Sequence, residues 1–417
     1  MNLTAIVAFI FVFGVLVTVH EFGHFFVAKK SGVLIREFAI GMGPKIISWN
    51  YNHTAYTIRI LPVGGYVRMA GLDEEPDLDA GQRVRLIFNT ANQVIKMDTR
   101  IDELGEGAFF QVDTFDLSDE LTLTGYLNDN ENKQTLSVDH DATIIEKNGT
   151  EIQIAPRDSW VQSAKVYKRA LINIAGPAMN LILALVVFSG LAFALPSVTL
   201  DKPIVGAVKS DMPAKQAGLQ ANDRIIAING HKTKTWDQAA TRISNSKNNV
   251  LTFSVLRDGK KRIVNMTPKT VKIDGIESAI IGITAKTYTD FGSRIKYGFL
   301  TTGTTISKVW YALSHLFTGG FSLDKLGGPV SIAKYTSSAA KTGFLSILGF
   351  MAMLSINLGI MNLIPIPALD GGKLVLNAIE AVLRRPLPAS FENAVTVGGA
   401  IFMFVLMIAV TINDLLR

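Results

Sequence analysis

The five residues His20-Glu21-Phe22-Gly23-His24 lie near the end of an apolar run that extends from Leu3 to Ala28. In an α-helix, positions i and i+4 lie on one face, a turn apart, so the two imidazoles can contact one metal ion. Zinc accepts two imidazoles and a carboxylate and leaves a fourth position for water, from which Glu21 could take a proton. Ionisable residues within a span are costly and usually functional. The alternative is a helix that leaves the membrane with polar residues at the interface.

Three further apolar runs are long enough, or nearly so, to cross a bilayer, which requires about 20 residues. Hydrophobic residues make up 48% of the 417 residues, a high share for a soluble enzyme. The first run could instead be a signal peptide, but no Lys or Arg precedes it, it is too long, and no small-residue cleavage site follows. The predicted spans are residues 3–28, 171–195, 344–364 and 395–412.

Short basic flanks predict how the spans are oriented. By the positive-inside rule these flanks are cytoplasmic, so both termini and residues 196–343 are expected outside the cell membrane. Residues 201–296 carry 17 Lys/Arg against 8 acids, but long domains cross regardless of charge. Their spread favours a solvated basic face, able to meet anionic lipid, over a nucleic-acid site. The flanks are Lys29, Lys30, Arg36, Lys45; Lys165, Lys168, Arg169; and Lys373, Arg384, Arg385.

The region between the first two spans predicts β-structure. Residues 56–60 alternate apolar with polar side chains, a break follows at Pro62 and Gly64-Gly65, and Tyr66-Val67-Arg68-Met69 continues, which is typical of a hairpin. Residues 73–165 contain 20 Asp/Glu against 8 Lys/Arg, with Thr/Val/Ile/Leu alternation. We interpret them as a small β-rich cytoplasmic insertion, with a disordered acidic linker as the alternative.

Residues 203–269 resemble a PDZ domain of the bacterial protease type. The run Met212-Pro213-Ala214-Lys215-Gln216-Ala217-Gly218-Leu219 predicts a short helix, and residues 223–230 predict a strand that ends in an Asn-Gly turn. Residues 251–256 and 262–266 flank Asp258-Gly259 as a hairpin. PDZ domains bind extended peptides or C-termini by strand addition, so a peptide partner is expected here.

A third metal ligand is needed, because the chain contains no cysteine and any zinc must use His, Asp or Glu. The stretch from Asn362 to Gly372, NLIPIPALDGG, offers Asp370 just beyond the third span. Pro365 and Pro367 break the helix there, and irregular backbone at membrane depth is tolerated only inside protein or beside a wet cavity. A helix-ending turn with a solvated Asp370 remains the alternative.

Together these motifs resemble the site-2 protease family, in particular its bacterial RseP/RasP type of intramembrane zinc protease. The resemblance covers most of the chain and includes GGYV at 64–67, GPAMN at 176–180 and the PDZ-like segment. It implies that Zn2+ is bound by His20, His24 and Asp370, with Glu21 as general base. It implies substrate contacts for Asn362, near the backbone or oxyanion, and for an edge strand with Gly64, Gly65, Tyr66 and Val67. It also implies a contact near the active site for Asn180, with a hydrogen bond between helices as the alternative.

We therefore predict a polytopic α-helical membrane protein with four spans, a membrane-associated β-hairpin, a β-rich cytoplasmic insertion and one extracytoplasmic PDZ domain. The predicted boundaries are 1–30 (first span with HExxH), 31–72 (hairpin), 73–165 (insertion), 166–196 (second span), 197–290 (PDZ), 291–343 (amphipathic membrane-surface linker), 344–375 (third span with NxxPxPxLDGG) and 376–417 (loop and fourth span).

The resemblance implies cleavage of single-span membrane proteins, such as anti-sigma factors and leftover signal peptides, after another protease has cut first. One departure is that Gram-negative members carry two PDZ domains, whereas this chain has one, which points to the Gram-positive-like branch. The first alternative is a catalytically silent scaffold that recruits partners through its PDZ domain. A metal-containing transporter is disfavoured, because no internal repeat is present. The remaining histidines, His53, His140, His231 and His315, lack ligand spacing and are expected at the surface.

Overall fold

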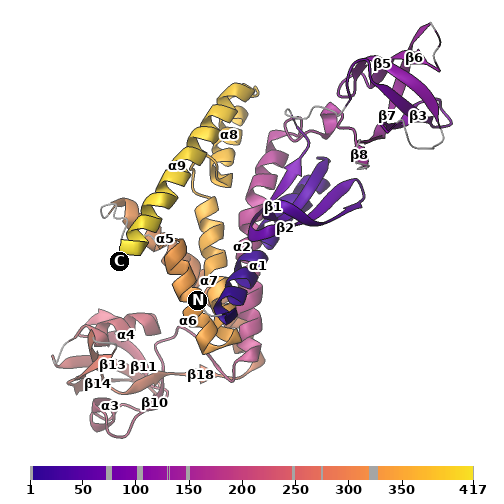
Figure 1. The fold of residues 1–417 in the computed structure, drawn as a ribbon. Coiled ribbons are helices and arrows are strands. Elements are labelled where there is room, and N and C mark those ends of the chain that lie inside the picture. The colour runs from indigo at the N-terminus through magenta and orange to yellow at the C-terminus, as the bar shows by residue number, and fades with distance from the viewer. Residues whose placement is uncertain are drawn as a thin grey trace. The chain divides into compact units, whose positions relative to one another are not determined.

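The computed structural model describes residues 3–71, 78–100, 107–128, 130, 132–146, 151–246, 249–273, 276–318 and 327–416. The chain divides into two compact units. One comprises Met1–Leu183 and Val309–Arg417, and the other comprises Ala184–Lys308. Helices and small sheets make up both units (Figure 1).

Four helices among the described residues are long and apolar enough to cross a membrane. Each contains most or all of one predicted apolar run, and the third ends at Asn362, where the proline-rich stretch begins. This agrees with the expectation of a multi-pass membrane protein. The helices are α1 (Leu3–Lys30), α2 (Val166–Ala194), α7 (Phe344–Asn362) and α9 (Ala389–Leu416).

Glycines let α1 and α7 approach α2 closely. A Cβ added at Gly23 of α1 would lie 2.4 Å from the carbonyl oxygen of Ala175 in α2. One added at Gly359 of α7 would lie 2.9 Å from the carbonyl oxygen of Pro177, which α2 accommodates within its length. Small residues at such contacts allow dense backbone packing between apolar helices. The position of α1 against α2 therefore depends on the absence of a side chain at Gly23.

Strands β1 (Ile35–Tyr51) and β2 (Thr54–Met69) form one sheet in which part of each strand pairs with two different segments of the other. Residues 37–40 are matched both with 65–68 and with 55–58. The segment 65–69 has a strand partner on one side only among the described residues, so its other edge is free to pair. The predicted edge strand is therefore present.

The turn of this hairpin differs from the prediction. It lies at Asn52-His53, whose φ angles of 49° and 60° are left-handed, as two-residue hairpin turns require. The Gly64-Gly65 pair, predicted as the turn, instead lies inside β2, where Gly64 has φ 85°. The alternation of apolar and polar residues ends before Pro62, which favours a turn at this point in the sequence. In the structure the strand bends there and continues.

The acidic insertion is folded where the structure describes it. Its strands form a sheet in the order β4-β3-β5-β6-β7-β8, and an additional pairing of β4 with β7 joins distant strands of that sheet. Fully buried Leu86, Met97, Phe110 and Leu123 belong to its core. This agrees with the β-rich expectation and not with a disordered linker. The strands are β3 (Arg83–Phe88), β4 (Val94–Asp98), β5 (Ala108–Asp116), β6 (Thr122–Leu127), β7 (Lys133–Ile145) and β8 (Glu151–Gln153), followed by the 3-10 helix η1 (Arg157–Ser159).

The second unit contains the short elements expected for the PDZ-like segment. Its main sheet has the order β12-β11-β13-β14, and Phe253, Ile225 and Ile228 lie in its buried core. The elements are β9 (Val198–Thr199), β10 (Val205–Val208), α3 (Pro213–Gln216), β11 (Arg224–Ile228), β12 (His231–Lys232), α4 (Trp236–Ser244), β13 (Leu251–Arg257), β14 (Lys260–Met266), β15 (Lys269–Ile273), β16 (Ile276–Ile280), β17 (Ile283–Ala285) and β18 (Thr287–Tyr288).

The region predicted as an amphipathic linker contains two helices, α5 (Phe291–Thr318) and α6 (Pro329–Thr342). Helix α6 packs against α1, α7 and α9. Asp414 of α9 accepts hydrogen bonds from the backbone N–H groups of Gly328 and Ser331 at 2.9 and 3.0 Å, so it caps the start of α6. A Cβ at Gly328 would lie 2.8 Å from Asp414 Oδ2, which explains the glycine there.

A further helix, α8, spans Asp370–Leu383. A loop was predicted from residue 376 onward, so the structure differs from the prediction there. Its polar residues Asp370, Lys373, Asn377 and Glu380 recur at helical spacing, with apolar residues between them. The polar stripe masked the helix in a search for uniformly apolar runs. Because α8 begins at Asp370, the predicted metal ligand is held by a helix start.

Candidate metal centre

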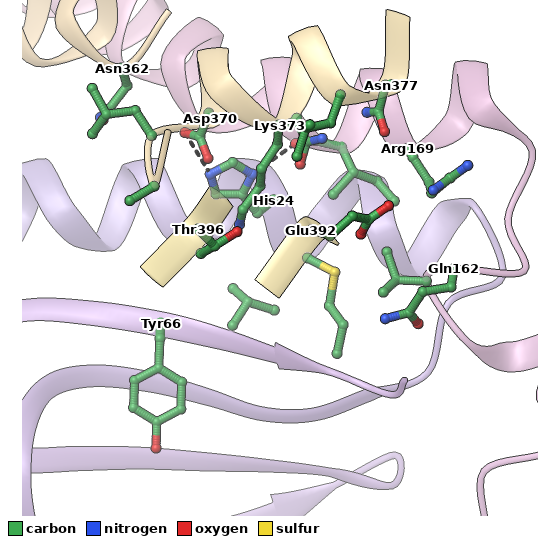
Figure 2. A pocket seen from close by; sticks show the side chains of 18 of the residues that line it. His24, Tyr66, Gln162, Arg169, Asn362, Asp370, Lys373, Asn377, Glu392 and Thr396 are labelled. Atoms are coloured by element: carbon green, nitrogen blue, oxygen red, sulfur yellow. Dashed lines mark hydrogen bonds and ion pairs between the residues drawn. The ribbon is translucent and has the colours of Figure 1, made fainter. Parts of the chain in front are cut away.

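The three predicted ligands come together in the first unit. Nε2 of His20 and Nε2 of His24 each lie 3.3 Å from Oδ2 of Asp370, and the two nitrogens lie 3.2 Å apart. Both histidines are 8% exposed. Figure 2 shows His24 and Asp370 directed toward each other from different helices. Among the described residues this is the only group of three or more His, Cys, Asp or Glu that could hold a metal ion.

The triangle of ligand atoms fits a tetrahedral zinc ion. Zinc with ligand bonds of about 2.0–2.1 Å holds neighbouring ligand atoms about 3.3 Å apart, and the three observed separations are 3.2–3.3 Å. Oδ2 of Asp370 is buried and has no hydrogen-bond donor among the described residues. A bound cation would satisfy this oxygen, so the donor set and its spacing both suit zinc.

A backbone carbonyl of α2 orients His24. Its Nδ1 lies 2.7 Å from the carbonyl oxygen of Ile172, so Nδ1 carries the proton and donates it. That leaves Nε2 as the unprotonated, ligating nitrogen. Gly176, one turn further along α2, permits this arrangement, because a Cβ there would lie 2.2 Å from His24 Nε2.

Asn180, on the same helix, orients His20. Its amide nitrogen lies 3.1 Å from His20 Nδ1, while its Oδ1 is buried without a partner among the described residues. Exchanging the amide nitrogen and oxygen lets His20 Nδ1–H donate to Oδ1, which leaves Nε2 of His20 as the unprotonated, ligating nitrogen. Asn180 is 0% exposed and does not line the cavity described below. The structure thus places Asn180 behind His20, and its contact with substrate stays a prediction.

The loop before Asp370 is shaped by close contacts. Ala368 has a left-handed φ of 73°, which costs a non-glycine residue free energy and is typical of functional sites. A Cβ at Gly371 would lie 2.2 Å from the carbonyl oxygen of Ile364. On the far side, Gly399 of α9 lies against Pro367, where a Cβ would come within 2.4 Å. The two prolines and the glycines therefore place Asp370 at one defined position.

A cavity of about 550 Å³ opens onto the ligands and onto Glu21. Of the residues predicted to contact substrate, Asn362, Tyr66 and Val67 line it. Gly65 lies against α1, where an added Cβ would be 3.4 Å from Cγ of Glu21. The free edge 65–69 thus passes directly beside the predicted general base.

A buried carboxylate that the sequence did not indicate fixes Tyr66. Its hydroxyl donates to Oε2 of Glu37 at 2.9 Å, while Thr57 and Arg59 donate to Oε1 at 2.6 and 2.7 Å. Burial opposes ionisation of Glu37, but these three hydrogen bonds lower its pKa below the usual range. In Figure 2 the Tyr66 ring points away from His24. The network therefore holds together three segments of the small sheet, and the Tyr66 hydroxyl stabilises that sheet.

The cavity also contains polar residues that the sequence analysis did not single out for the site. Arg169 and Lys373 were considered only as basic flanks, and the helical polar stripe on α8 was the signal that could have found Asn377. They are Gln162, Arg169 and Asn173 around the start of α2, Lys373 and Asn377 on α8, and Glu392, Asn393 and Thr396 on α9.

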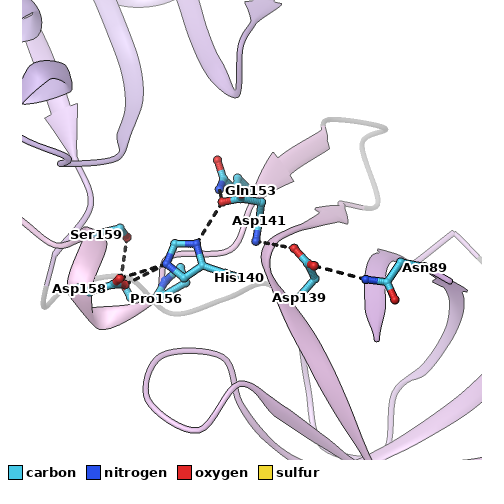
Figure 3. Close-up of polar contacts among 8 residues, drawn as sticks. All are labelled: Asn89, Asp139, His140, Asp141, Gln153, Pro156, Asp158 and Ser159. Carbon is cyan, nitrogen blue, oxygen red and sulfur yellow. Dashed lines mark hydrogen bonds and ion pairs between the residues drawn. The ribbon is translucent and has the colours of Figure 1, made fainter. Parts of the chain in front are cut away.

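A second polar cluster lies in the insertion (Figure 3). Nδ1 of His140 lies 3.1 Å from Asp141 Oδ1, and its Nε2 lies 3.1 Å from Asp158 Oδ1. The hydrogen bond with Asp141 raises the pKa of His140, burial opposes this, and Asp158 raises it further. All three side chains are at least half exposed. This is a surface ion-pair cluster, in line with the expectation for His140.

Comparisons with known proteins bear on this centre. The model of peptidase family M50 matches residues 8–406. The probable protease eep of Enterococcus faecalis is 44% identical, with 99% of each chain covered. A Lactococcus lactis protein named as a zinc metalloprotease is 43% identical over 99% of this chain and 98% of its own. One from Staphylococcus aureus, also so named, is 41% identical over 100% and 99%.

Among solved structures, a PDZ domain of an SdrC-like protein from Listeria monocytogenes covers 21% of this chain and 90% of its own, with 26% identity and a TM-score of 0.19. The family model and the relatives cover nearly the whole chain, and the names of the relatives imply zinc. The chain therefore belongs to peptidase family M50, the site-2 protease family, and is a zinc metalloendopeptidase.

Proposed function

We propose that this protein cuts peptide bonds within the membrane-spanning segments of single-span proteins. The observation that carries the proposal is the triangle of His20, His24 and Asp370 atoms, 3.2–3.3 Å on each side, at the end of an apolar helix. Ionisable groups at such a position are costly unless they serve a reaction. Peptide hydrolysis at the end of a span explains why they are tolerated.

The chain's own residues divide the work. His20, His24 and Asp370 would hold zinc, which when bound polarises a carbonyl and makes water easier to deprotonate. Glu21 takes the proton from the attacking water and can then pass it to the leaving amine nitrogen. Asn362 lines the same cavity and has an amide that can bind the substrate backbone or the developing oxyanion.

The substrate must be extended before it can be cut, because a helix hides its carbonyls in internal hydrogen bonds. The free edge of residues 65–69, which passes Glu21, supports strand pairing as the way to hold it. Helix-weakening residues in the target, such as glycine or proline, would lower the cost of unwinding. We expect cleavage to favour substrates with such residues near the cut.

The wider setting follows from the basic flanks and the family resemblance. We propose that the termini and the PDZ-like segment lie outside the cytoplasmic membrane and the insertion lies inside. The PDZ-like segment would then select substrates already shortened by another protease, within regulated intramembrane proteolysis. Anti-sigma factors and leftover signal peptides are the substrate classes we propose.

The test is cleavage of a tagged single-span model substrate in detergent, with zinc content measured on the same samples. The wild type should bind zinc and cut, while His24→Ala should lose both zinc and cutting. A wild type that holds zinc but cuts no shortened single-span substrate would contradict the intramembrane proposal.

A further inference from the structure

The catalytic cavity continues beyond the metal centre along one face of α8. Asp370, Lys373 and Asn377 line it at positions i, i+3 and i+7 of that helix. From Asp370 to Asn377 the rise is about 10 Å, the length of about three residues of extended chain. In Figure 2, Asn377, Arg169 and Glu392 all lie on the opposite side of Asp370 from Asn362. The cavity therefore offers space for substrate residues that flank the scissile bond.

Two hydrogen-bond donors in this part of the cavity have no acceptor among the described residues. Asn377 is 7% exposed, and its Nδ2 is buried and unpartnered. Nε of Arg169 is likewise buried and unpartnered. Both residues line the cavity. Leaving a buried donor unsatisfied is costly, so both donors favour an acceptor that a ligand in the cavity can bring to them.

The Arg169 guanidinium is held in place. Its Nη2 pairs with Oε2 of Glu380 at 2.5 Å, and the Glu380 side chain is 2% exposed. Oε1 of Glu380 accepts a hydrogen bond from the N–H of Leu387 at 2.9 Å, which fixes the carboxylate from the other side. Arg169 therefore cannot turn its Nε toward another partner without breaking a buried ion pair.

Charge decides which acceptor fits. Arg169 already pairs with Glu380, and the Glu392 carboxylate interacts with both of them. Two carboxylates around one guanidinium repel a further anion, even with Lys373 elsewhere in the cavity. A neutral carbonyl oxygen can accept from Arg169 Nε and Asn377 Nδ2 without that repulsion. The donors thus suit a peptide carbonyl better than a free carboxylate.

We propose that Asn377 and Arg169 form a substrate subsite, which binds a backbone carbonyl of a residue flanking the scissile bond. The subsite rests on the proposed function, because it requires a peptide at the metal centre. It contributes binding without taking part in bond breaking. Because it reads backbone, it accepts many sequences, while the adjacent Glu380 and Glu392 disfavour acidic side chains nearby.

The test uses a series of hydroxamates, whose metal-binding group carries zero, one, two or three peptide residues on either side. In the wild type, the extension that reaches Asn377 should tighten inhibition by about 3- to 10-fold. We call this gain in affinity the extension step. In Asn377→Leu this step should vanish, while zinc content and inhibition by the unextended hydroxamate stay unchanged. Asn265→Leu, at an exposed position of β14 outside the cavity lining, is the matched control and should keep the step.

Asn377→Asp provides a second variant that keeps the side-chain shape and replaces the donor by an acceptor. It should also lose the step. The step surviving in both variants, or no step with any extension in the wild type, would overturn the subsite and leave the metal centre intact. A zinc-loaded wild type that no hydroxamate inhibits would overturn the metal-centre assignment, and the subsite with it.

Discussion

The metal centre and the edge strand beside it are built in different ways. The centre consists of side chains from α1 and α8, each oriented by α2 or by a tight loop. The edge of residues 65–69 instead offers backbone, and its position depends on the Glu37 network and on Gly65. Changes behind the ligands should therefore cost zinc, whereas changes behind the strand should cost substrate binding while zinc stays.

The largest effect is expected from Gly176→Ala. Its Cβ would lie 2.2 Å from His24 Nε2, so His24 must leave the ligand triangle. Zinc affinity should fall by at least about 100-fold, with a matching loss of cleavage. Zinc titration of purified protein measures this. Gly190→Ala on the same helix, whose added Cβ has no neighbour within 4 Å among the described residues, should behave like the wild type.

Replacing Asn180 should sharpen the assignment of the amide. Asn180→Leu removes the acceptor for His20 Nδ1–H and should weaken zinc binding by about 10- to 100-fold. Asn180→Asp keeps an acceptor oxygen at that place and should hold zinc nearly as well as the wild type. If Asp were as damaging as Leu, then Asn180 does not accept a proton from His20.

On the strand side, Gly65→Ala should separate zinc binding from substrate binding. Its Cβ would lie 2.8 Å from the carbonyl oxygen of Ala39 and 3.0 Å from Val17, so the edge must move away from α1. We expect an increase in KM of about tenfold with full zinc content. Gly14→Ala on α1, whose added Cβ meets no atom within 4 Å in the part of the chain that the structure describes, is the control. Loss of zinc in Gly65→Ala would erase the contrast between the two regions.

The smallest effect concerns pH. Because the folded state lowers the pKa of Glu37, the unfolded chain binds more protons in acid. The stabilisation is therefore present above the unfolded pKa of about 4.3 and is lost as pH falls through the lower folded value. Glu37→Gln should cost about 1–3 kcal/mol at neutral pH. Thermal unfolding in detergent should show a smaller drop between pH 6 and pH 3 for Glu37→Gln than for the wild type.

The sequence predicted the parts of this protein that depend on spacing. HExxH places two imidazoles on one helical face, and the proline-rich stretch marks Asp370, because both patterns act locally. The sequence did not predict what depends on tertiary contact. The Ile172 carbonyl carries no residue-type signal, the contact between Asn180 and His20 joins residues 160 positions apart, and the partners of Glu37 lie 20 to 29 residues away.

The same distinction explains the errors in the fold. The Asn52-His53 turn was missed, because Gly64-Gly65 has the stronger turn composition. Helix α8 was missed because its polar stripe faces a cavity that a sequence pattern cannot show. Arg169 appeared only as a basic flank, although its buried pairing with Glu380 places it in the catalytic cavity.

The most direct test is to measure zinc content and peptide hydrolysis on one purified sample of Glu21→Gln. The side chain of Glu21 is close to the ligands but is not one of them. We predict one zinc per chain, as in the wild type, and a cleavage rate at least about 100-fold lower. Cleavage at the wild-type rate, or loss of zinc from this variant, would contradict the assignment of ligands and base.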